Sequence, residues 1–250
     1  MNLIFIRHGQ SLWNLENRFT GWIDIDLSDR GEKEAAKAGL TLMKYNFFPE
    51  YCFTSFLIRS KNTATILMQE LTKNHKFKTE IIEDWHLNER HYGSLQGLDK
   101  IETSRKYGEE QVQIWRRSYE TTPPLAIKNS KDDPKLNAIY SDIKEELPLG
   151  ESLKDVVNRV KNILHKITEM SLNSKVLVVA HGNSIRAMTK VIDNISDTDI
   201  VDVNIPTGIP LAYNVSSEGI ERIGYLSDEN DILKLQKEVE LQSKINNKKG

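Results

Sequence analysis

Residues 3–11 read LIFIRHGQS, a short apolar run that ends in Arg-His-Gly, and residues 176–184 repeat the pattern as VLVVAHGNS. Short apolar runs that end at a turn are typical of strands buried within a parallel sheet. Ligand sites in open sheets of this kind lie beyond the carboxyl ends of the strands. The two runs therefore predict that His8 and His181 lie at the same site.

Strands and helices are expected to alternate along most of the chain. In residues 28–45, for example, Ala35, Ala38 and Leu42 share one helical face, and Ser28 can cap the first turn. The expected strands are residues 2–7, 51–54, 78–82 and 175–180, with a closing pair at 212–215 and 220–225, and the expected helices are 28–45, 59–71, 152–172 and 184–192. This order predicts an α/β fold with a mostly parallel central sheet and helices on both faces.

The alternation stops between residues 85 and 148. A loop of that length without secondary structure is improbable inside a compact domain, so the segment is expected to be an inserted subdomain of helices and loops. Residues 1–235 are then expected to form a single domain that contains this insertion. Residues 236–250 are polar and rich in Lys and Asn, and they are expected to form a mobile C-terminal tail.

The composition excludes several classes of protein. The 250 residues include 34 Lys and Arg against 36 Asp and Glu, so no overall basic charge favours nucleic acid as a partner. The single cysteine, Cys52, excludes an internal disulfide and a cysteine-based zinc site. No apolar run is long enough to cross a bilayer and no secretory signal is visible, so we expect no membrane partner and a cytoplasmic location.

The residues at the two His-Gly turns suit phosphoryl chemistry. An imidazole can act as a covalent nucleophile towards phosphorus, and the guanidinium of Arg7 matches the geometry of phosphate oxygens. Glycines let backbone N–H groups approach a ligand, and the N-termini of the following helices favour an anion. No Ser nucleophile elbow, Walker loop or carboxylate pair with metal spacing competes with this interpretation, so no metal is expected.

Beyond these turns, the chain resembles the histidine phosphatase superfamily and, within it, the cofactor-dependent phosphoglycerate mutases. The superfamily motif is the Arg7-His8-Gly9 turn with His181 downstream, and the mutase-like stretches are RFTGW at 18–22, LNERHYG at 87–93, LDK at 98–100, WRR at 115–117 and NIPTG at 204–208. Gln10 departs from the Glu that relatives commonly have. Ser11 is similar to the glycolytic mutases rather than to the specialised bisphosphoglycerate mutases.

The resemblance implies a role for each matching residue. His8 would be the nucleophile, with Arg7, Arg59 and His181 around the phosphate and Glu89 as proton donor and acceptor. Substrate binding would involve Asn14, Thr20, Gly21, Arg90, His91, Tyr92, Lys100, Arg116, Arg117, Gly182 and Asn183, with His91 in a supporting place. A monophosphate would require fewer cations than this set supplies, whereas a bisphosphoglycerate has a second anionic end.

The resemblance also implies the reaction. The expected activity interconverts 3-phosphoglycerate and 2-phosphoglycerate in glycolysis and gluconeogenesis, through phosphohistidine and with 2,3-bisphosphoglycerate as the cofactor. Relatives suggest a homodimer or homotetramer.

Two alternatives remain open at this stage. One is a phosphatase of the same superfamily, such as a sugar-bisphosphate phosphatase, in which water accepts the phosphoryl group. The other is a non-catalytic scaffold that binds phosphorylated ligands. The mutase-like stretches at 89–92 and 115–117 argue against the first, and the joint presence of His8, Glu89 and His181 argues against the second.

Overall fold

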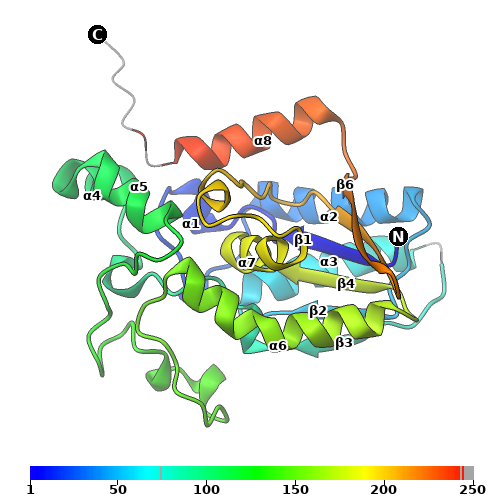
Figure 1. The fold of residues 1–250 in the computed structure, drawn as a ribbon, viewed down its shortest axis with the longest axis horizontal. Helices are drawn as coiled ribbons and strands as arrows, with labels where there is room; N and C mark the ends of the chain where they lie inside the picture. Colours follow the sequence, from blue (N-terminus) through cyan, green and yellow to red (C-terminus); the bar gives the residue numbers. More distant parts are fainter. Residues whose placement is uncertain (74, 243, 245–250) are drawn as a thin grey trace.

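A six-stranded sheet runs through the centre of the molecule in the computed structural model, which describes residues 1–73, 75–242 and 244 (Figure 1). The strand order is β3-β2-β4-β1-β5-β6. Four neighbouring strands are parallel, and the last two are antiparallel: β1 (Leu3–Arg7), β2 (Tyr51–Thr54), β3 (Glu80–Glu83), β4 (Val176–Ala180), β5 (Leu211–Ser216) and β6 (Gly219–Tyr225). The strand expected at 78–82 begins two residues later than predicted, at Glu80.

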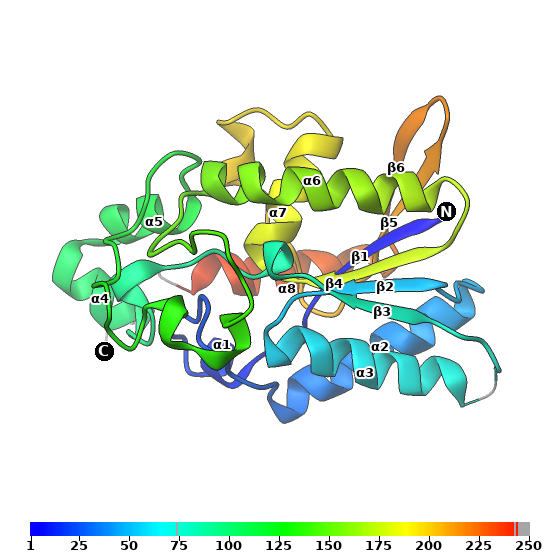
Figure 2. The ribbon, with the colours of Figure 1, turned by 90° about the horizontal axis from the view of Figure 1, so that it is seen from below.

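Helices cover both faces of this sheet (Figure 2). Ile4 and Ile6 of β1 pack with α2 (Asp29–Lys44) and α3 (Ile58–Thr72). Leu3 and Phe5 face the opposite way and join the core formed with α6 (Leu153–Ser171) and α7 (Gly182–Ile192). Both sides of each central strand are therefore buried, which explains the continuous apolar runs, and the predicted α/β class is confirmed.

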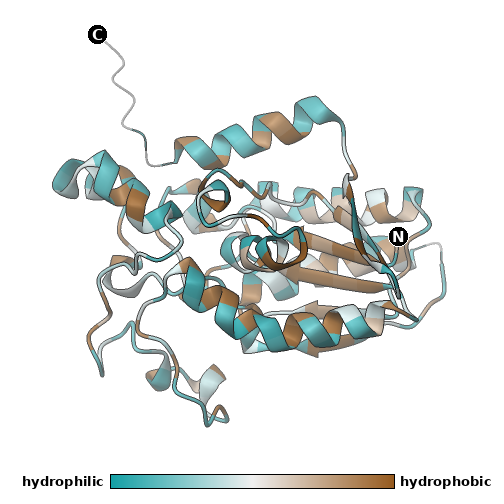
Figure 3. Ribbon diagram, in the orientation of Figure 1, coloured by the Kyte–Doolittle hydropathy of each residue, from teal (hydrophilic) through white to brown (hydrophobic). Residues whose placement is uncertain are grey.

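Polar caps fix where the main helices begin. The hydroxyl of Ser28 accepts a hydrogen bond from the N–H of Gly31 at the start of α2. Ser152 and Asp155 form a reciprocal capping box at the start of α6. Figure 3 shows the apolar strands in the centre and helices with one polar face outside them. In the described part of the chain, no helix is long and apolar enough to cross a membrane.

Residues 85–148 leave the carboxyl end of β3 and form short helices joined by loops. They comprise η1 (Trp85–Leu87), η2 (Gly93–Leu95), α4 (Lys100–Tyr107), α5 (Glu109–Arg117), η3 (Pro134–Leu136) and η4 (Ala138–Tyr140). Trp85, Tyr140 and Leu147 of this segment pack on Trp22 in a small core of their own. The insertion is thereby anchored to the loop that follows α1 (Leu12–Leu15).

The C-terminal segment, expected to form a mobile tail, contains part of a helix. Residues 236–241 belong to helix α8 (Glu229–Leu241), whereas 243 and 245–250 lie outside the described residues. The helix lies beside α2 through the ion pairs Arg30–Glu238 at 2.7 Å and Lys37–Asp231 at 3.1 Å. No side chain of α8 is fully buried, so its sequence lacks a strong apolar stripe.

Cys52 lies in the middle of β2 with an exposed fraction of 0%. Burial raises the pKa of its thiol to about 12. The side chain therefore acts as a small apolar group in the core beside α2 and α3.

Candidate active site

The pairing of β1 with β4 brings the two histidines together. Arg7 lies opposite Ala180 in the parallel ladder, and the N–H of His8 donates to the carbonyl of Ala180 at 2.9 Å. The rings of His8 and His181 then lie with their centroids 4.9 Å apart. This proximity follows from the strand register, as the repeated sequence pattern predicted.

The ring of His8 is held in one tautomer by its backbone. Its Nδ1 lies 2.6 Å from the carbonyl oxygen of Gly9, and because a carbonyl only accepts, Nδ1 carries the hydrogen. The lone pair is therefore on Nε2. Burial, together with the charges of Arg59 and Arg7, lowers the pKa of His8 well below its usual value. A neutral imidazole with a free Nε2 lone pair is the reactive state for attack on phosphorus.

Hydroxyl groups behind His181 fix its ring. The Ser60 hydroxyl donates to the carbonyl of Leu57 at 2.9 Å, so in its 2.6 Å contact with Ser55 it accepts. The hydroxyl hydrogen of Ser55 is therefore donated to Ser60. In its 2.7 Å contact with Nε2 of His181, the Ser55 oxygen accepts, so Nε2 carries the hydrogen. Burial, reinforced by Arg59, lowers the pKa of His181 well below its usual value.

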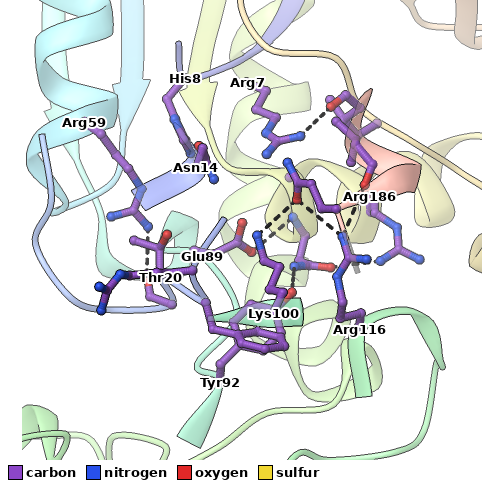
Figure 4. Close-up of a pocket in the computed structure, with 18 of the residues that line it drawn as sticks. Arg7, His8, Asn14, Thr20, Arg59, Glu89, Tyr92, Lys100, Arg116 and Arg186 are labelled. Atoms are coloured by element: carbon purple, nitrogen blue, oxygen red, sulfur yellow. Dashed lines mark hydrogen bonds between the residues drawn. The ribbon is translucent and has the colours of Figure 1, made fainter. Parts of the chain in front are cut away.

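A cavity opens beside His8 (Figure 4). Among its wall residues in the described part of the chain, Glu89 is the one carboxylate. Within the same described residues, no group of three or more His, Cys, Asp or Glu side chains could hold a metal ion. The wall consists of Arg7, His8, Asn14, Arg18, Phe19, Thr20, Gly21, Arg59, Glu89, Tyr92, Lys100, Arg116, Arg117, Gly182, Asn183, Arg186, Ile205, Val239 and Gln242.

The arginines beside His8 are held by backbone carbonyls. Arg7 donates through Nη1 to Ile205 at 2.8 Å, and Arg59 donates through Nη2 to Gly21 at 2.7 Å. Gly21 has a φ of +54°, and a Cβ there would lie 2.2 Å from the side chain of Gln96, so this turn requires glycine. Backbone anchoring aims the guanidinium groups without neutralising their charge.

Several buried donors around the cavity find no acceptor among the described residues. Leaving such groups unpaired costs about 1–3 kcal/mol each, so a ligand with acceptor oxygens is the fitting partner. The unpaired atoms are Nε of Arg7, Nε of Arg59, Oγ1 of Thr20, Nη2 of Arg117 and Nε of Arg186.

Crowding of like charges makes the same cavity strongly attractive to anions. Burial, followed by the charge of Arg117, lowers the pKa of Arg116 to about 9. Burial lowers the pKa of Arg59 to about 10, and burial followed by Arg116 and Arg7 lowers the pKa of Lys100 well below its usual value. An anion in the cavity would relieve this mutual repulsion.

Glu89 lies on the cavity wall beside the turn that follows His181. Its Oε1 accepts hydrogen bonds from the backbone N–H groups of Arg90 at 2.7 Å and Asn183 at 3.1 Å. A Cβ at position 182 would lie 3.5 Å from the guanidinium of Arg7 and 3.6 Å from Oε2 of Glu89. Gly182 therefore lies in ordinary contact distance of both the arginine and the carboxylate.

The end of the cavity farther along the insertion is lined by Lys100 at the start of α4 and by Arg116 and Arg117 at the end of α5. The C-terminal segment closes over two of them. Gln242 Oε1 accepts from Lys100 Nζ at 3.1 Å, and the carbonyl of Val239 accepts from Arg116 at 3.2 Å. The insertion and α8 thus build this part of the site jointly.

Two residues from the predicted site lie behind the wall. Arg90 is fully buried, donates to the carbonyl of Arg116 at 2.8 Å and stacks 4.6 Å from the ring centre of Tyr92. The backbone N–H of His91 donates to Glu151 at 2.8 Å, and its Nε2 lies 3.1 Å from the carbonyl of Asp132. The structure therefore brings neither side chain to the cavity surface, whereas the other predicted residues lie on it or, for His181, directly behind His8.

Sequence reasoning missed several wall residues. Arg186 lies one turn after Asn183 in α7 and donates to Asn183 Oδ1 at 2.9 Å, so its helical spacing from the second His-Gly turn was an available signal. Val239 and Gln242 had no such signal, because their place depends on where α8 docks.

Comparison with known families gives one extensive match. The family described as Histidine phosphatase superfamily (branch 1) matches residues 3–133 and 118–209. Together these ranges cover most of the chain and include both His-Gly turns.

Three curated relatives are similar over most of their length, and each is a 2,3-bisphosphoglycerate-dependent phosphoglycerate mutase. The protein of Lachnoclostridium phytofermentans is 46% identical over 88% of both chains. The protein of Hydrogenobaculum sp. is 44% identical, and that of Borreliella afzelii is 45% identical, each over 97% of this chain and 98% of the relative.

Solved structures share the fold at lower identity. The mycobacterial glucosyl-3-phosphoglycerate phosphatase complexed with VO3 aligns with a TM-score of 0.66 at 22% identity, over 88% of this chain and 95% of that one. A putative α-ribazole-5'-P phosphatase of Escherichia coli aligns with a TM-score of 0.67 at 15% identity, over 90% of this chain and 95% of that one. At these identities the likeness concerns the fold alone.

Proposed function

Because the chain belongs to the 2,3-bisphosphoglycerate-dependent phosphoglycerate mutases of the histidine phosphatase superfamily, we propose that the cavity beside His8 interconverts 3-phosphoglycerate and 2-phosphoglycerate. The observation that carries the proposal is the charge of the cavity wall. Six buried cations line it, with Glu89 as the one carboxylate among the described wall residues: Arg7, Arg59, Lys100, Arg116, Arg117 and Arg186. A bisphosphoglycerate, with two phosphates and a carboxylate, matches this excess of positive charge.

His8 performs the phosphoryl transfer in this proposal. Nε2 forms a bond to phosphorus while the bond from phosphorus to the donor oxygen breaks, and the electron pair leaves on that oxygen. Arg7 and Arg59 bind the equatorial oxygens, which carry the charge as the group moves. In the reverse direction, phosphorylated His8 yields its phosphoryl group to a substrate hydroxyl.

Glu89 handles the proton of each transfer. Its carboxylate takes the proton from the accepting hydroxyl and gives it to the departing alkoxide in the opposite direction. The backbone N–H groups of Arg90 and Asn183 hold Oε1, which leaves Oε2 on the side of Gly182 and Arg7. The proton-transfer atom is thus Oε2.

The residues present fit 2,3-bisphosphoglycerate as the cofactor. Unpaired donors lie at both ends of the cavity, on Arg7 and Arg59 beside His8 and on Arg117 in the insertion. When bound, the cofactor supplies the phosphoryl group that primes His8. Lys100, Arg116 and Arg117 would hold its distal anionic end, and Asn14, Thr20 and the Gly182-Asn183 turn would hold the reacting end.

Other features of the protein are part of the same proposal. Residues 1–235 form one domain with an insertion at 85–148, the protein works in the cytoplasm, and no metal takes part. We also propose a homodimer or homotetramer, which is supported by the outer position of β3 in the sheet and the 53% exposure of Ile81 on it.

Labelling with 2,3-bisphosphoglycerate that carries a radioactive phosphoryl group tests the proposal. His8 should take up acid-labile label, and added 3-phosphoglycerate should discharge it into product. His8→Ala should lose both labelling and turnover while it stays folded. Rapid discharge of the label to water would identify a phosphatase. Labelling retained in His8→Ala would place the nucleophile elsewhere. Loss of activity in EDTA would contradict the metal-free mechanism.

A further inference from the structure

One buried guanidinium, Arg159 of α6, binds the backbone of the strand-to-insertion loop that carries Glu89. Its Nη2 donates to the carbonyls of Asn88 at 2.9 Å and Glu89 at 3.0 Å, and its Nη1 donates to the carbonyl of His86. The side chain is only 8% exposed and lies outside the cavity wall. Arg159 therefore contacts three carbonyls of the segment 86–89, which ends at the proton-transfer residue, without lying on the cavity wall.

Glu151 completes the arrangement from the other side. It pairs with Arg159 Nε at 2.6 Å, and its side chain is 3% exposed. Its Oε2 accepts from the backbone N–H of His91 at 2.8 Å, and its own N–H donates to the carbonyl of His91 at 2.9 Å. The ion pair thus holds the loop both before and after Glu89.

The carbonyl of Glu89 receives a second donor, the indole N–H of Trp22 at 2.5 Å. The guanidinium of Arg159 lies 5.9 Å from the centre of the same indole. Glu89 is therefore fixed at its main chain by Arg159 and Trp22 and at its carboxylate by two backbone N–H groups. Its Oε2 position depends on all of these contacts.

We propose that the Arg159–Glu151 ion pair is a positioning device for the proton transfer made by Glu89, an inference that rests on the function proposed above. A buried ion pair is a weak source of stability, because desolvation offsets much of its Coulomb energy. It does fix geometry, since a planar guanidinium bridging three carbonyls tolerates little displacement. Displacement of a catalytic group by about 1 Å can cost roughly a hundredfold in rate.

The leaving group of the phosphoryl donor provides a readout that a structural role would not change. Nitrophenolate departs without a proton, whereas phenolate and alkoxides benefit from protonation by Glu89. The quantity to measure is the rate of His8 phosphorylation in a single turnover, with p-nitrophenyl phosphate and with phenyl phosphate. Misplacement of Glu89 should slow the reaction with phenyl phosphate more than that with p-nitrophenyl phosphate. The ratio of the nitrophenyl rate to the phenyl rate should therefore rise.

Arg159→Lys keeps the charge but cannot bridge three carbonyls, and Glu151→Gln keeps the shape but removes the ion pair. Each should lower mutase kcat roughly tenfold to a hundredfold, with KM changed less than about threefold, and should raise the nitrophenyl-to-phenyl ratio. Val160→Ala is the matched control, because Val160 is the buried neighbour in α6 and contacts the core instead of the loop. It should lower the melting temperature and leave the ratio unchanged.

Glu89→Gln provides the reference. It should raise the ratio strongly, and Arg159→Lys added to it should cause little further loss, because the two act in series. An unchanged ratio in Glu89→Gln would overturn the proposed role of Glu89 itself. A normal Glu89→Gln result, with no ratio change in Arg159→Lys or Glu151→Gln, would overturn only the positioning role. Glu151→Asp, a milder change, takes their place if either variant does not fold.

Discussion

At the scale of single residues, burial of uncharged imidazoles makes the stability of the protein depend on pH. The pKa values of His8 and His181 lie well below their usual value, chiefly through burial, and that of His91 is lowered in the same way. In the unfolded chain these groups take up protons near pH 6.5. The unfolded state therefore binds more protons than the folded state below that pH.

The resulting stability is fully present above pH 6.5 and is lost as the pH falls below it. Each histidine contributes a slope of about 1.4 kcal/mol per pH unit to the free energy of unfolding. Urea denaturation between pH 7.5 and 5.5 measures this slope. His8→Asn should reduce the slope of the unfolding free energy against pH by the contribution of one histidine. An unchanged slope in that variant would show that His8 is charged in the folded protein.

The proposed function divides the arginines between the reacting and the distal end of the substrate. Arg117→Ala should raise KM for 3-phosphoglycerate roughly tenfold to a hundredfold, because a charge-assisted contact contributes about 1.5–3 kcal/mol. Its effect on p-nitrophenyl phosphate, which lacks a distal anion, should be small. Arg7→Ala should impair both reactions. Steady-state kinetics with 3-phosphoglycerate and with p-nitrophenyl phosphate test this assignment. If Arg117→Ala lost activity towards both substrates equally, the assignment of Arg117 to the distal end would be wrong.

At the scale of elements, α8 is held over the cavity by exposed contacts. The pairs Arg30–Glu238 and Lys37–Asp231 are solvent-accessible, so each contributes little, about 0–1 kcal/mol, and less in high salt. Gln236 adds a hydrogen bond to the carbonyl of Asn204 at 3.1 Å. Together with the hydrogen bonds from Lys100 to Gln242 and from Arg116 to Val239, these are contacts that opening of the cavity would break.

Truncation after Asp228 should consequently leave the folded core intact and open the distal end of the cavity. Loss of the Val239 and Gln242 contacts should raise KM for phosphoglycerate and let water reach phosphorylated His8. The ratio of phosphoenzyme hydrolysis to mutase turnover should rise several-fold in a labelled assay. Arg30→Gln, which removes the ion pairs of Arg30 with Glu34 and Glu238, is the mild control. An unchanged ratio after truncation would contradict a closing role for α8.

Elements with a strong apolar pattern were predictable from the sequence, and those without one were not. The central strands and α6 have continuous or periodic apolar residues because both sheet faces are buried. The strand ends then placed His8 and His181 together. By contrast, α8 buries no side chain completely, and the cavity places of Arg186 and Gln242 arise from tertiary packing that local patterns do not encode. His91 shares a motif with Glu89, yet its side chain points into the insertion.

At the scale of the whole molecule, the concentration of buried cations predicts stabilisation by small anions. A ligand that binds only the folded state adds about 1.4 kcal/mol for each tenfold concentration above its Kd. Inorganic phosphate and vanadate should therefore raise the melting temperature of the protein in the millimolar range. Sodium chloride at equal ionic strength is the control, and an equal rise in chloride would show that general screening rather than site binding is responsible.

The buried thiol in β2 has a practical consequence. Cys52 lies in β2, and its side chain is buried in the core beside α2 and α3 with its pKa raised to about 12, so a disulfide reagent reacts with it only after this core opens. Since the chain has one cysteine, its labelling rate in the native protein measures how often the core between the sheet and these helices opens. Labelling should be slow, should accelerate in urea in step with global unfolding, and should slow again in phosphate. The chain thus contains its own reporter of rare opening, outside the cavity wall and without any engineered probe.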